Sequence, residues 1–188
     1  MSAIPQRLFS EEEYRRREEM SPFKSEYYRG EIFAMAGGTP RHAEITMSFG
    51  AALKRKKPRQ CRVYSGDAQI HIPQNTLYTY PDVSVVCGKP EIVNNALCNP
   101  ILIVEVLSPS TRNYDRNEKR LLYAEIPTLK EYVVVEQDEE RVDVWRKDSS
   151  GAWVFLPMLD GAASIHLDSL NCDINLDEIY ERFELDGE

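Results

Sequence analysis

Residues 100–136 decide the fold, and they read PILIVEVLSPSTRNYDRNEKRLLYAEIPTLKEYVVVE. The runs ILIVEVL and EYVVV are rich in β-branched residues and have the length of buried strands. A polar loop and a helical pattern lie between them. Asp115 is the expected N-cap of this helix, Glu118 completes a D-x-x-E pattern, and Pro127 ends it. The stretch therefore predicts two buried strands connected by a helix.

Two further β-rich runs, CRVYSGDAQIHIP and YPDVSVVCG, precede this stretch and are bounded by turn-forming residues. Before them, residues 42–57 are predicted to form an amphipathic helix that Pro58 stops. The apolar residues of that helix recur at helical spacing, namely Ile45, Phe49, Ala52 and Leu53.

The N-terminal part is predicted to contain a short helix and a hairpin. Ser10 and Glu13 form a capping-box pattern that starts a helix over residues 10–19. The stretch YYRGEIFAMAGG has an Arg29-Gly30 turn between apolar-rich arms, which indicates a β-hairpin.

The C-terminal part alternates in hydrophobicity through RVDVWRKD, AWVFLPM and SIHLDSL, which predicts an antiparallel meander followed by a short helix near Leu176. The whole order fits an α+β domain with a mixed central sheet flanked by helices and an additional meander. No linker is evident, so residues 1–188 are predicted to form a single domain.

Composition excludes several classes of protein. Hydrophobic residues make up 42% and charged residues 29% of the 188 residues, as in ordinary globular proteins. No apolar run is long enough for a signal peptide or a membrane span, so we expect a cytoplasmic protein. The four cysteines form no CxxC pair, and we expect reduced thiols.

The net charge of -8 argues against a broad nucleic-acid-binding surface, so any contact with DNA must be local. One basic stretch contains Lys54, Arg55, Lys56, Lys57, Arg59 and Arg62 and is interpreted as a solvated helix end. A second contains Arg112, Arg116, Lys119 and Arg120.

Glu105 is unusual because it lies inside the apolar run ILIVEVL, where a carboxylate needs a partner or a metal. Asp82 opens the preceding strand. If these strands pair antiparallel with residue 87 facing residue 100, then Asp82 faces Glu105. Directly opposed side chains have Cβ atoms about 5 Å apart, so both carboxylates can reach one cation.

Two interpretations of this pair remain open. Mg²⁺ or Mn²⁺ would keep both carboxylates ionised and remove their repulsion. Alternatively, Asp82 caps a turn, and Glu105 pairs with a buried Arg or Lys.

Lys119 follows on the next helix, where it shares a face with Tyr123. It could form an exposed ion pair with Asp115, worth about 0.3 to 0.5 kcal/mol. It could instead stand beside the metal, orient water and stabilise phosphorane charge.

These residues resemble the PD-(D/E)XK nuclease superfamily, and in particular its Uma-type family of endonucleases. The resembling segments are YYRGEIFAMAGGTPRHAEI, YPDVSVVCG and residues 100–136, in that order. The resemblance implies a restriction endonuclease-like fold in which Asp82 and Glu105 hold the metal, with the Val106 carbonyl as a further ligand.

The lysine departs from the superfamily pattern. Its usual position, two residues after the glutamate, is Leu107 here. Uma-type sequences resemble this one in placing a lysine on the following helix, which implies that Lys119 takes that role.

Three more residues are candidates from the resembling segments. The superfamily often has an acid on its first core helix, and the matching Glu44 is included in the predicted catalytic set. A solvated first-turn glutamate is the alternative. Glu31 is interpreted as a water-facing hairpin residue, and His42 as either a base or phosphate contact or a helix-start capping residue.

The resemblance implies an Mg²⁺- or Mn²⁺-dependent endonuclease that hydrolyses phosphodiester bonds, with DNA as the expected substrate. The alternatives are an inactive nuclease-fold module that binds DNA or protein partners, which Leu107 supports, and a hydrolase of other phosphoesters. A homodimer is suggested because many proteins of this type work in pairs. The apolar meander residues that would offer its surface are Val142, Val144, Trp145, Trp153 and Phe155.

Overall fold

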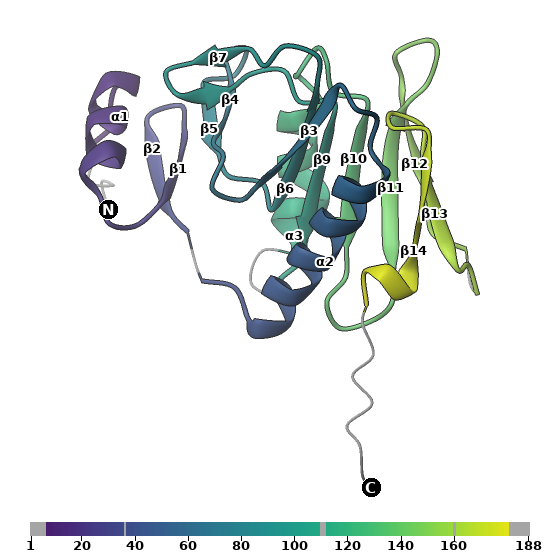
Figure 1. Ribbon diagram of the computed structural model, residues 1–188. Coiled ribbons are helices and arrows are strands. Elements are labelled where there is room, and N and C mark those ends of the chain that lie inside the picture. The colour runs from purple at the N-terminus through teal and green to yellow at the C-terminus, as the bar shows by residue number, and fades with distance from the viewer. Residues whose placement is uncertain (1–6, 36, 110–111, 160, 181–188) are drawn as a thin grey trace, which may run out of the picture.

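A six-stranded mixed sheet organises the structure (Figure 1). The computed structural model describes residues 7–35, 37–109, 112–159 and 161–180. The central sheet has the order β12-β11-β10-β9-β6-β3, in which β9 and β10 are parallel and the other neighbours are antiparallel. Its strands are β3 (Cys61–Ser65), β6 (Val83–Cys87), β9 (Leu102–Val106), β10 (Glu131–Val135), β11 (Val142–Lys147) and β12 (Trp153–Leu156).

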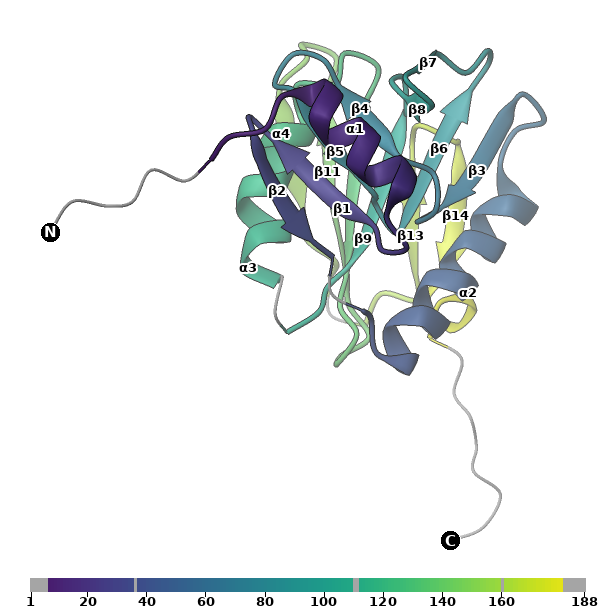
Figure 2. The ribbon, with the colours of Figure 1, turned by 90° about the vertical axis from the view of Figure 1, so that its left-hand side faces the viewer.

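A second sheet has the order β2-β1-β5-β4-β8-β7. Its strands are β1 (Ser25–Tyr28), β2 (Glu31–Ala34), β4 (Ile70–Ile72), β5 (Leu77–Thr79), β7 (Ile92–Val93) and β8 (Ala96–Leu97). Helix α1 (Glu11–Met20) crosses this sheet (Figure 2) and packs Tyr14 against the rings of Tyr27 and Tyr78.

The two faces of the central sheet are covered differently. Helix α2 (Pro40–Lys56) packs on one face through Ile45, Phe49, Ala52 and Leu53, which have no exposed surface. The hairpin of β13 (Ser164–Leu167) and β14 (Cys172–Asn175) joins the same core. The helical segment after β9 and the second sheet pack on the opposite face, around Ile103, Leu107, Tyr123 and Tyr132. Figure 1 shows α2 in front of the sheet and α3 behind it.

Several predicted elements are confirmed. Ser10 and Glu13 form the capping box of α1. Arg29 and Gly30 have φ of 48° and 97°, the positive values that a tight two-residue hairpin turn requires. The α2 helix begins two residues earlier than predicted, at Pro40, because the Thr39 side chain caps it. The α+β class, with its mixed sheet and flanking helices, is also confirmed.

The prediction of a helix capped by Asp115 is wrong about where the helical segment starts and about its type. Three short pieces replace it: α3 (Arg112–Tyr114), the π-helix η1 (Asp115–Lys119) and α4 (Arg120–Tyr123). Asp115 lies inside this segment, 5% exposed, and does not cap it. The Tyr132 hydroxyl donates to the Asp115 carbonyl over 2.9 Å, so part of this turn is held by the sheet. Single-turn π-helices are frequent at functional sites.

The predicted meander is only partly correct. β11 and β12 extend the central sheet, whereas β13 and β14 form a separate hairpin. The Glu131 carboxylate explains this arrangement, because it accepts hydrogen bonds from the backbone N–H groups of Asp168 and Ser169 and holds the hairpin turn against β10. The terminal helix is a 3₁₀ turn, η2 (Leu176–Glu178).

The expectation of reduced thiols is wrong for two of the four cysteines. Cys61 and Cys87 are disulfide-bonded across β3 and β6. They occupy a pair without mutual backbone hydrogen bonds, as the bond from the Gly88 N–H to the Gln60 carbonyl shows. Side chains are closest at such pairs. In the described ranges, no helix combines the length and apolar character that a bilayer crossing requires.

Candidate active site

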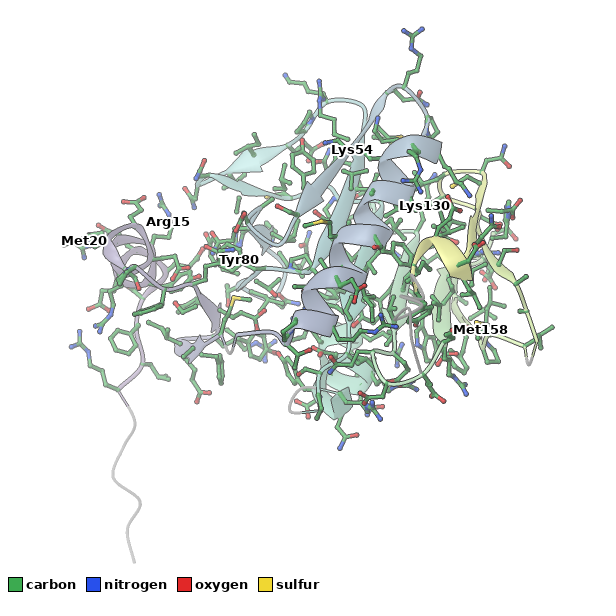
Figure 3. All side chains as sticks on the ribbon, turned by 60° about the horizontal axis from the view of Figure 1, so that its bottom comes forward. Arg15, Met20, Lys54, Tyr80, Lys130 and Met158 are labelled. Carbon is green, nitrogen blue, oxygen red and sulfur yellow. A yellow bond between two sulfur atoms is a disulfide. The ribbon has the colours of Figure 1, made fainter. Side chains whose placement is uncertain are left out.

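A cavity of about 300 Å³ opens where β9 leaves the central sheet. The hairpin β1–β2, the start of α2 and the π-helix η1 surround it. Tyr80, which lies between α1 and α2 in Figure 3, forms part of the cavity wall. The lining residues with ionisable side chains are Glu26, His42, Tyr80, Asp82, Glu105, Tyr114, Asp115 and Lys119.

Asp82 and Glu105 meet at this cavity because of the strand register. β6 and β9 pair with Val83 opposite Val104, which is the predicted register and places Asp82 opposite Glu105. The backbone N–H of Asp82 donates to Glu105 Oε2 over 3.4 Å. The backbone N–H of Val106 donates to Asp82 Oδ2 over 2.7 Å. The backbones of the two strands therefore orient both carboxylates toward one space.

Glu105 is an almost completely buried acid, with 4% of its surface exposed. Burial raises the pKa of its carboxyl to about 8, even though the Lys119 ammonium acts in the opposite direction. The charges of Asp82 and Asp115 raise that pKa further. The ionised form of Glu105 is therefore costly in the protein alone, and a nearby cation would stabilise it.

Lys119 points into the cavity from η1. Its Nζ atom lies 2.9 Å from Glu105 Oε1, 3.1 Å from Glu26 Oε1 and 3.7 Å from Asp115 Oδ1. Burial by itself would lower the pKa of this ammonium, but the surrounding acids, led by Glu105, outweigh it and hold the pKa well above its ordinary value. Lys119 is therefore a buried group beside Glu105 whose acidic neighbours favour its protonated form.

Two further residues near Glu105 are Leu107 and Tyr123. Leu107, on the same face two residues later, has no exposed surface and packs in the apolar cluster with Tyr123. The Tyr123 hydroxyl donates to Glu105 Oε1 over 2.7 Å. Because Tyr123 follows Lys119 by one helical turn, the same segment supplies both the ammonium and this hydroxyl.

His42 reaches the site from the first turn of α2. Its backbone N–H donates a hydrogen bond to the side chain of Thr39, the N-cap of the helix. Its Nε2 atom lies 3.3 Å from Asp82 Oδ2. The hydrogen bond to Asp82 raises the pKa of His42, and a further bond to the Val106 backbone acts in the same direction. The structure thus brings His42 to the carboxylates, a point that the sequence left open.

Glu44 and Glu31 lie elsewhere. The Glu44 carboxylate pairs with Arg41 over 3.1 Å and is not among the groups that line the cavity. Glu31 sits opposite Tyr28 in the hairpin and does not line the cavity either.

Glu26, on β1, is an acid of the site that the sequence analysis missed. Nothing in a short hairpin indicates which acid will face another part of the chain. The available signal was the alternation around Tyr27, which is 5% exposed and packs against α1, so that Glu26 must point to the other side.

The donor set suits a hard divalent cation. Mg²⁺ is commonly bound by one or two carboxylates while it keeps several waters, and Asp82 and Glu105 supply two carboxylates at one edge of the cavity. Within the described part of the chain, no group of three or more His, Cys, Asp or Glu side chains is arranged to hold a metal ion. Asp82 and Glu105 are therefore a pair of candidate ligands and not a complete ligand cage.

Residues 11–177 match the model of the Uma2 family, which carries the description "Putative restriction endonuclease". This match spans nearly the whole chain. The chain belongs to the Uma2 family. Membership confirms the resemblance drawn from the three sequence segments.

Two relatives of this Uma2 chain come from Synechocystis sp. strain PCC 6803, and both are described as uncharacterized proteins. One, slr1290, is 35% identical over 173 residues, which cover 91% of this chain and 90% of the relative. The other, sll1609, is 33% identical over 163 residues, which cover 85% and 92%.

A solved structure shares the fold of this Uma2 chain. It is a crystal structure from Anabaena variabilis ATCC 29413, described as "a putative nuclease belonging to DUF820". The TM-score is 0.70 at 20% sequence identity, and the match covers 90% of this chain and 96% of the other. This likeness confirms the restriction endonuclease-like fold.

Proposed function

We propose that this Uma2-family protein is a divalent-metal-dependent endonuclease that hydrolyses phosphodiester bonds in DNA. The observation that carries the proposal is the convergence of Asp82, Glu105 and Lys119 from three elements on one cavity edge. A buried acid with a strongly perturbed pKa, a paired acid and a buried ammonium in one cavity form a constellation typical of catalytic sites.

Asp82 and Glu105 would hold Mg²⁺ or Mn²⁺, with the Val106 carbonyl as a third oxygen. A bound divalent ion lowers the pKa of water and polarises a phosphoryl oxygen. Glu105 needs such a charge more than Asp82 does, because it is buried and its pKa is raised. The hydrogen bonds from the N–H groups of Asp82 and Val106 keep the carboxylates in place without occupying every oxygen lone pair.

Lys119 is suited to stabilise negative charge on the reacting phosphate. Its ammonium is positioned by carboxylates before substrate arrives, so little reorganisation is needed during the reaction. The Tyr123 hydroxyl also donates to Oε1 of Glu105. His42, held by Asp82, stands at the mouth of the same cavity, where a cationic imidazole would contact a phosphate oxygen.

DNA as the substrate is supported by the description of the Uma2 family and by the buried Lys119 ammonium of the cavity, which can contact an anionic phosphate. The basic stretch begins at Lys54 on the last turn of α2 (Figure 3), whereas His42 lies in the first turn of the same helix. The stretch continues past the helix to Arg62 on β3. Arg55 and Lys56 in this stretch pair with Glu178. The remaining basic side chains there would contact the phosphate backbone away from the cleaved bond.

A homodimer would use the outer strand of the central sheet. Among the residues that the structure describes, β12 pairs with β11 alone and forms the edge of the sheet. Its residues Val154, Phe155 and Leu156 are 41%, 39% and 38% exposed, whereas Val142 and Val144, named above as surface candidates, are buried. Exposed apolar edge strands invite pairing with another chain. Light scattering after size exclusion, with a Phe155→Lys variant expected to be monomeric, tests this arrangement.

The test of the function is nicking of supercoiled plasmid DNA with Mg²⁺ or Mn²⁺. We expect activity that a chelator abolishes and that falls by at least about 100-fold in Asp82→Asn and Glu105→Gln. Asp67→Asn is the matched control, because Asp67 is 84% exposed and pairs with Lys24 at the surface. Equal rates in the wild type and both site variants would exclude this site.

A substrate panel decides between the proposed reaction and its rivals. Duplex DNA, single-stranded DNA, RNA and small phosphodiesters would be assayed in parallel. Hydrolysis of small diesters alone would indicate a different phosphoesterase. DNA binding without cleavage by the metal-loaded protein would indicate a binding module.

A further inference from the structure

Lys119 and four other side chains form a closed ring of polar contacts. Lys119 Nζ contacts Oε1 of both Glu26 and Glu105. The Thr79 hydroxyl donates to Glu26 Oε1 and lies 3.3 Å from the Tyr123 hydroxyl, which in turn donates to Glu105 Oε1. Each member of the ring therefore touches two others.

The ring joins elements that are distant in the sequence. Glu26 belongs to β1 and Thr79 to β5, both in the second sheet. Glu105 lies on β9 of the central sheet, whereas Lys119 and Tyr123 lie on η1 and α4. The second sheet thus supplies two of the four side chains that complete the ring with Lys119.

The ring is buried, which makes its geometry energetically demanding. The side chains of Lys119, Glu105 and Glu26 are 9%, 5% and 14% exposed. Thr79 has no exposed surface. In such surroundings an unmatched donor or acceptor costs roughly 1 to 3 kcal/mol, so each group constrains its neighbours.

We infer that Glu26 and Thr79 are positioning residues, which hold the Lys119 ammonium at the edge of the metal site and make the N-terminal hairpin part of the active site. Without Glu26, the carboxylates that remain within 4 Å of this nitrogen, among the residues that the structure describes, are those of Glu105 and the more distant Asp115. The ammonium would then move toward Glu105 and compete with the metal for it. Thr79 acts one step further out, by fixing the Glu26 carboxylate.

This inference rests on the proposed function for its catalytic consequence, but not for its geometry. The substitutions that test it are Glu26→Gln and Thr79→Val, which change shape little and remove one charge or one hydroxyl. The matched control is Glu31→Gln, which alters an acid of the same hairpin outside the cavity.

The kinetic test is a double-mutant cycle. We expect Glu26→Gln to lower kcat about tenfold with little change in KM, which corresponds to about 1.4 kcal/mol. In a Lys119→Met background the same substitution should have no further effect, because Glu26 acts only through Lys119. If Glu26 had a purely structural role, Glu26→Gln would lower kcat by the same factor in the wild-type and Lys119→Met backgrounds. That result would overturn the inference.

The second test requires no activity. In ¹⁵N NMR of the full chain, the Lys119 ammonium should give a side-chain signal whose protons exchange slowly with water. This signal should broaden or disappear in Glu26→Gln and Thr79→Val and remain in Glu31→Gln, with melting temperatures measured alongside. Persistence of the signal in both ring variants would overturn the inference. An inactive wild type whose signal depends on Glu26 would instead overturn the proposed function alone.

Discussion

The Nε2 atom of His42 lies 3.3 Å from Oδ2 of Asp82, so the first turn of α2 touches the acid that opens β6. This contact depends on Gly38. A Cβ atom added at Gly38 would lie 2.8 Å from Nδ1 of His42, closer than real Cβ atoms come to a neighbour. The glycine before the helix therefore leaves space for the histidine ring.

Gly38→Ala should displace the His42 ring from Asp82. Because the bond to Asp82 is the main cause that raises the pKa of His42, the variant should lower that pKa toward 6.5. Gly37→Ala is the matched control, since nothing lies within 4 Å of its added Cβ. An NMR titration of the three histidines measures the His42 pKa in both variants. An unchanged His42 pKa in Gly38→Ala would show that the ring keeps its contact with Asp82 despite the added Cβ, and would contradict the prediction.

Arg116→Met should destabilise the protein strongly. Arg116 pairs with Glu136 over 2.6 Å and with Asp143 over 3.2 Å, and these acids are only 3% and 2% exposed. Removing one partner of a buried ion pair costs about 3 to 5 kcal/mol, although Arg112 and Arg141 retain contacts with the two acids and should reduce the loss.

The comparison for Arg116→Met is Arg141→Met, because Arg141 is 39% exposed and contacts Asp143 alone among these acids. Its expected loss is below about 1 kcal/mol. Urea unfolding of the two variants measures the difference. A smaller loss in Arg116→Met than in Arg141→Met would contradict the buried network.

Glu178 should contribute to stability in a pH-dependent way. Its hydrogen bond from Lys56 is the main cause that lowers the pKa of its carboxyl from 4.5 to about 2. A lowered folded-state pKa means that the contribution is complete above about pH 4.5 and is lost as the pH falls through 2. Because the site is partly hydrated, we expect a contribution on the order of 1 kcal/mol.

Glu178→Gln should therefore be less stable than the wild type at neutral pH and similar to it near pH 2, provided that both remain folded there. Chemical unfolding at a series of pH values between 2 and 7 measures the difference. Glu139→Gln, at an exposed turn, should show no such convergence. A constant difference across the series would mean that the ion pairs with Arg55 and Lys56 do not stabilise the fold.

Glu44→Gln decides whether the helix acid expected from the superfamily takes part in catalysis. Its carboxylate pairs with Arg41 three residues earlier, a contact worth about 0.3 to 0.5 kcal/mol. From this geometry we expect unchanged plasmid nicking and a small loss of stability. A loss of nicking as large as that of Asp82→Asn would restore Glu44 to the catalytic set.

The sequence by itself determined the parts that depend on local pattern. The helical spacing of Ile45 and Phe49 and the Arg29-Gly30 turn each depend on residues close in the chain, and both are present as predicted. The facing of Asp82 and Glu105 was predicted by assuming one antiparallel register of their two strands, and the pairing of Val83 with Val104 matches that register.

Only the tertiary structure decided which other groups surround that pair. Glu26 reaches Lys119 because a second sheet packs beside the central one, and His42 reaches Asp82 because α2 begins at the sheet edge. The π-helix around Lys119 and the Cys61–Cys87 bond likewise depend on neighbours across the fold, namely Tyr132 and the opposed strand. Such contacts are set by how complete elements pack together, and packing joins residues whose spacing along the chain has no fixed period.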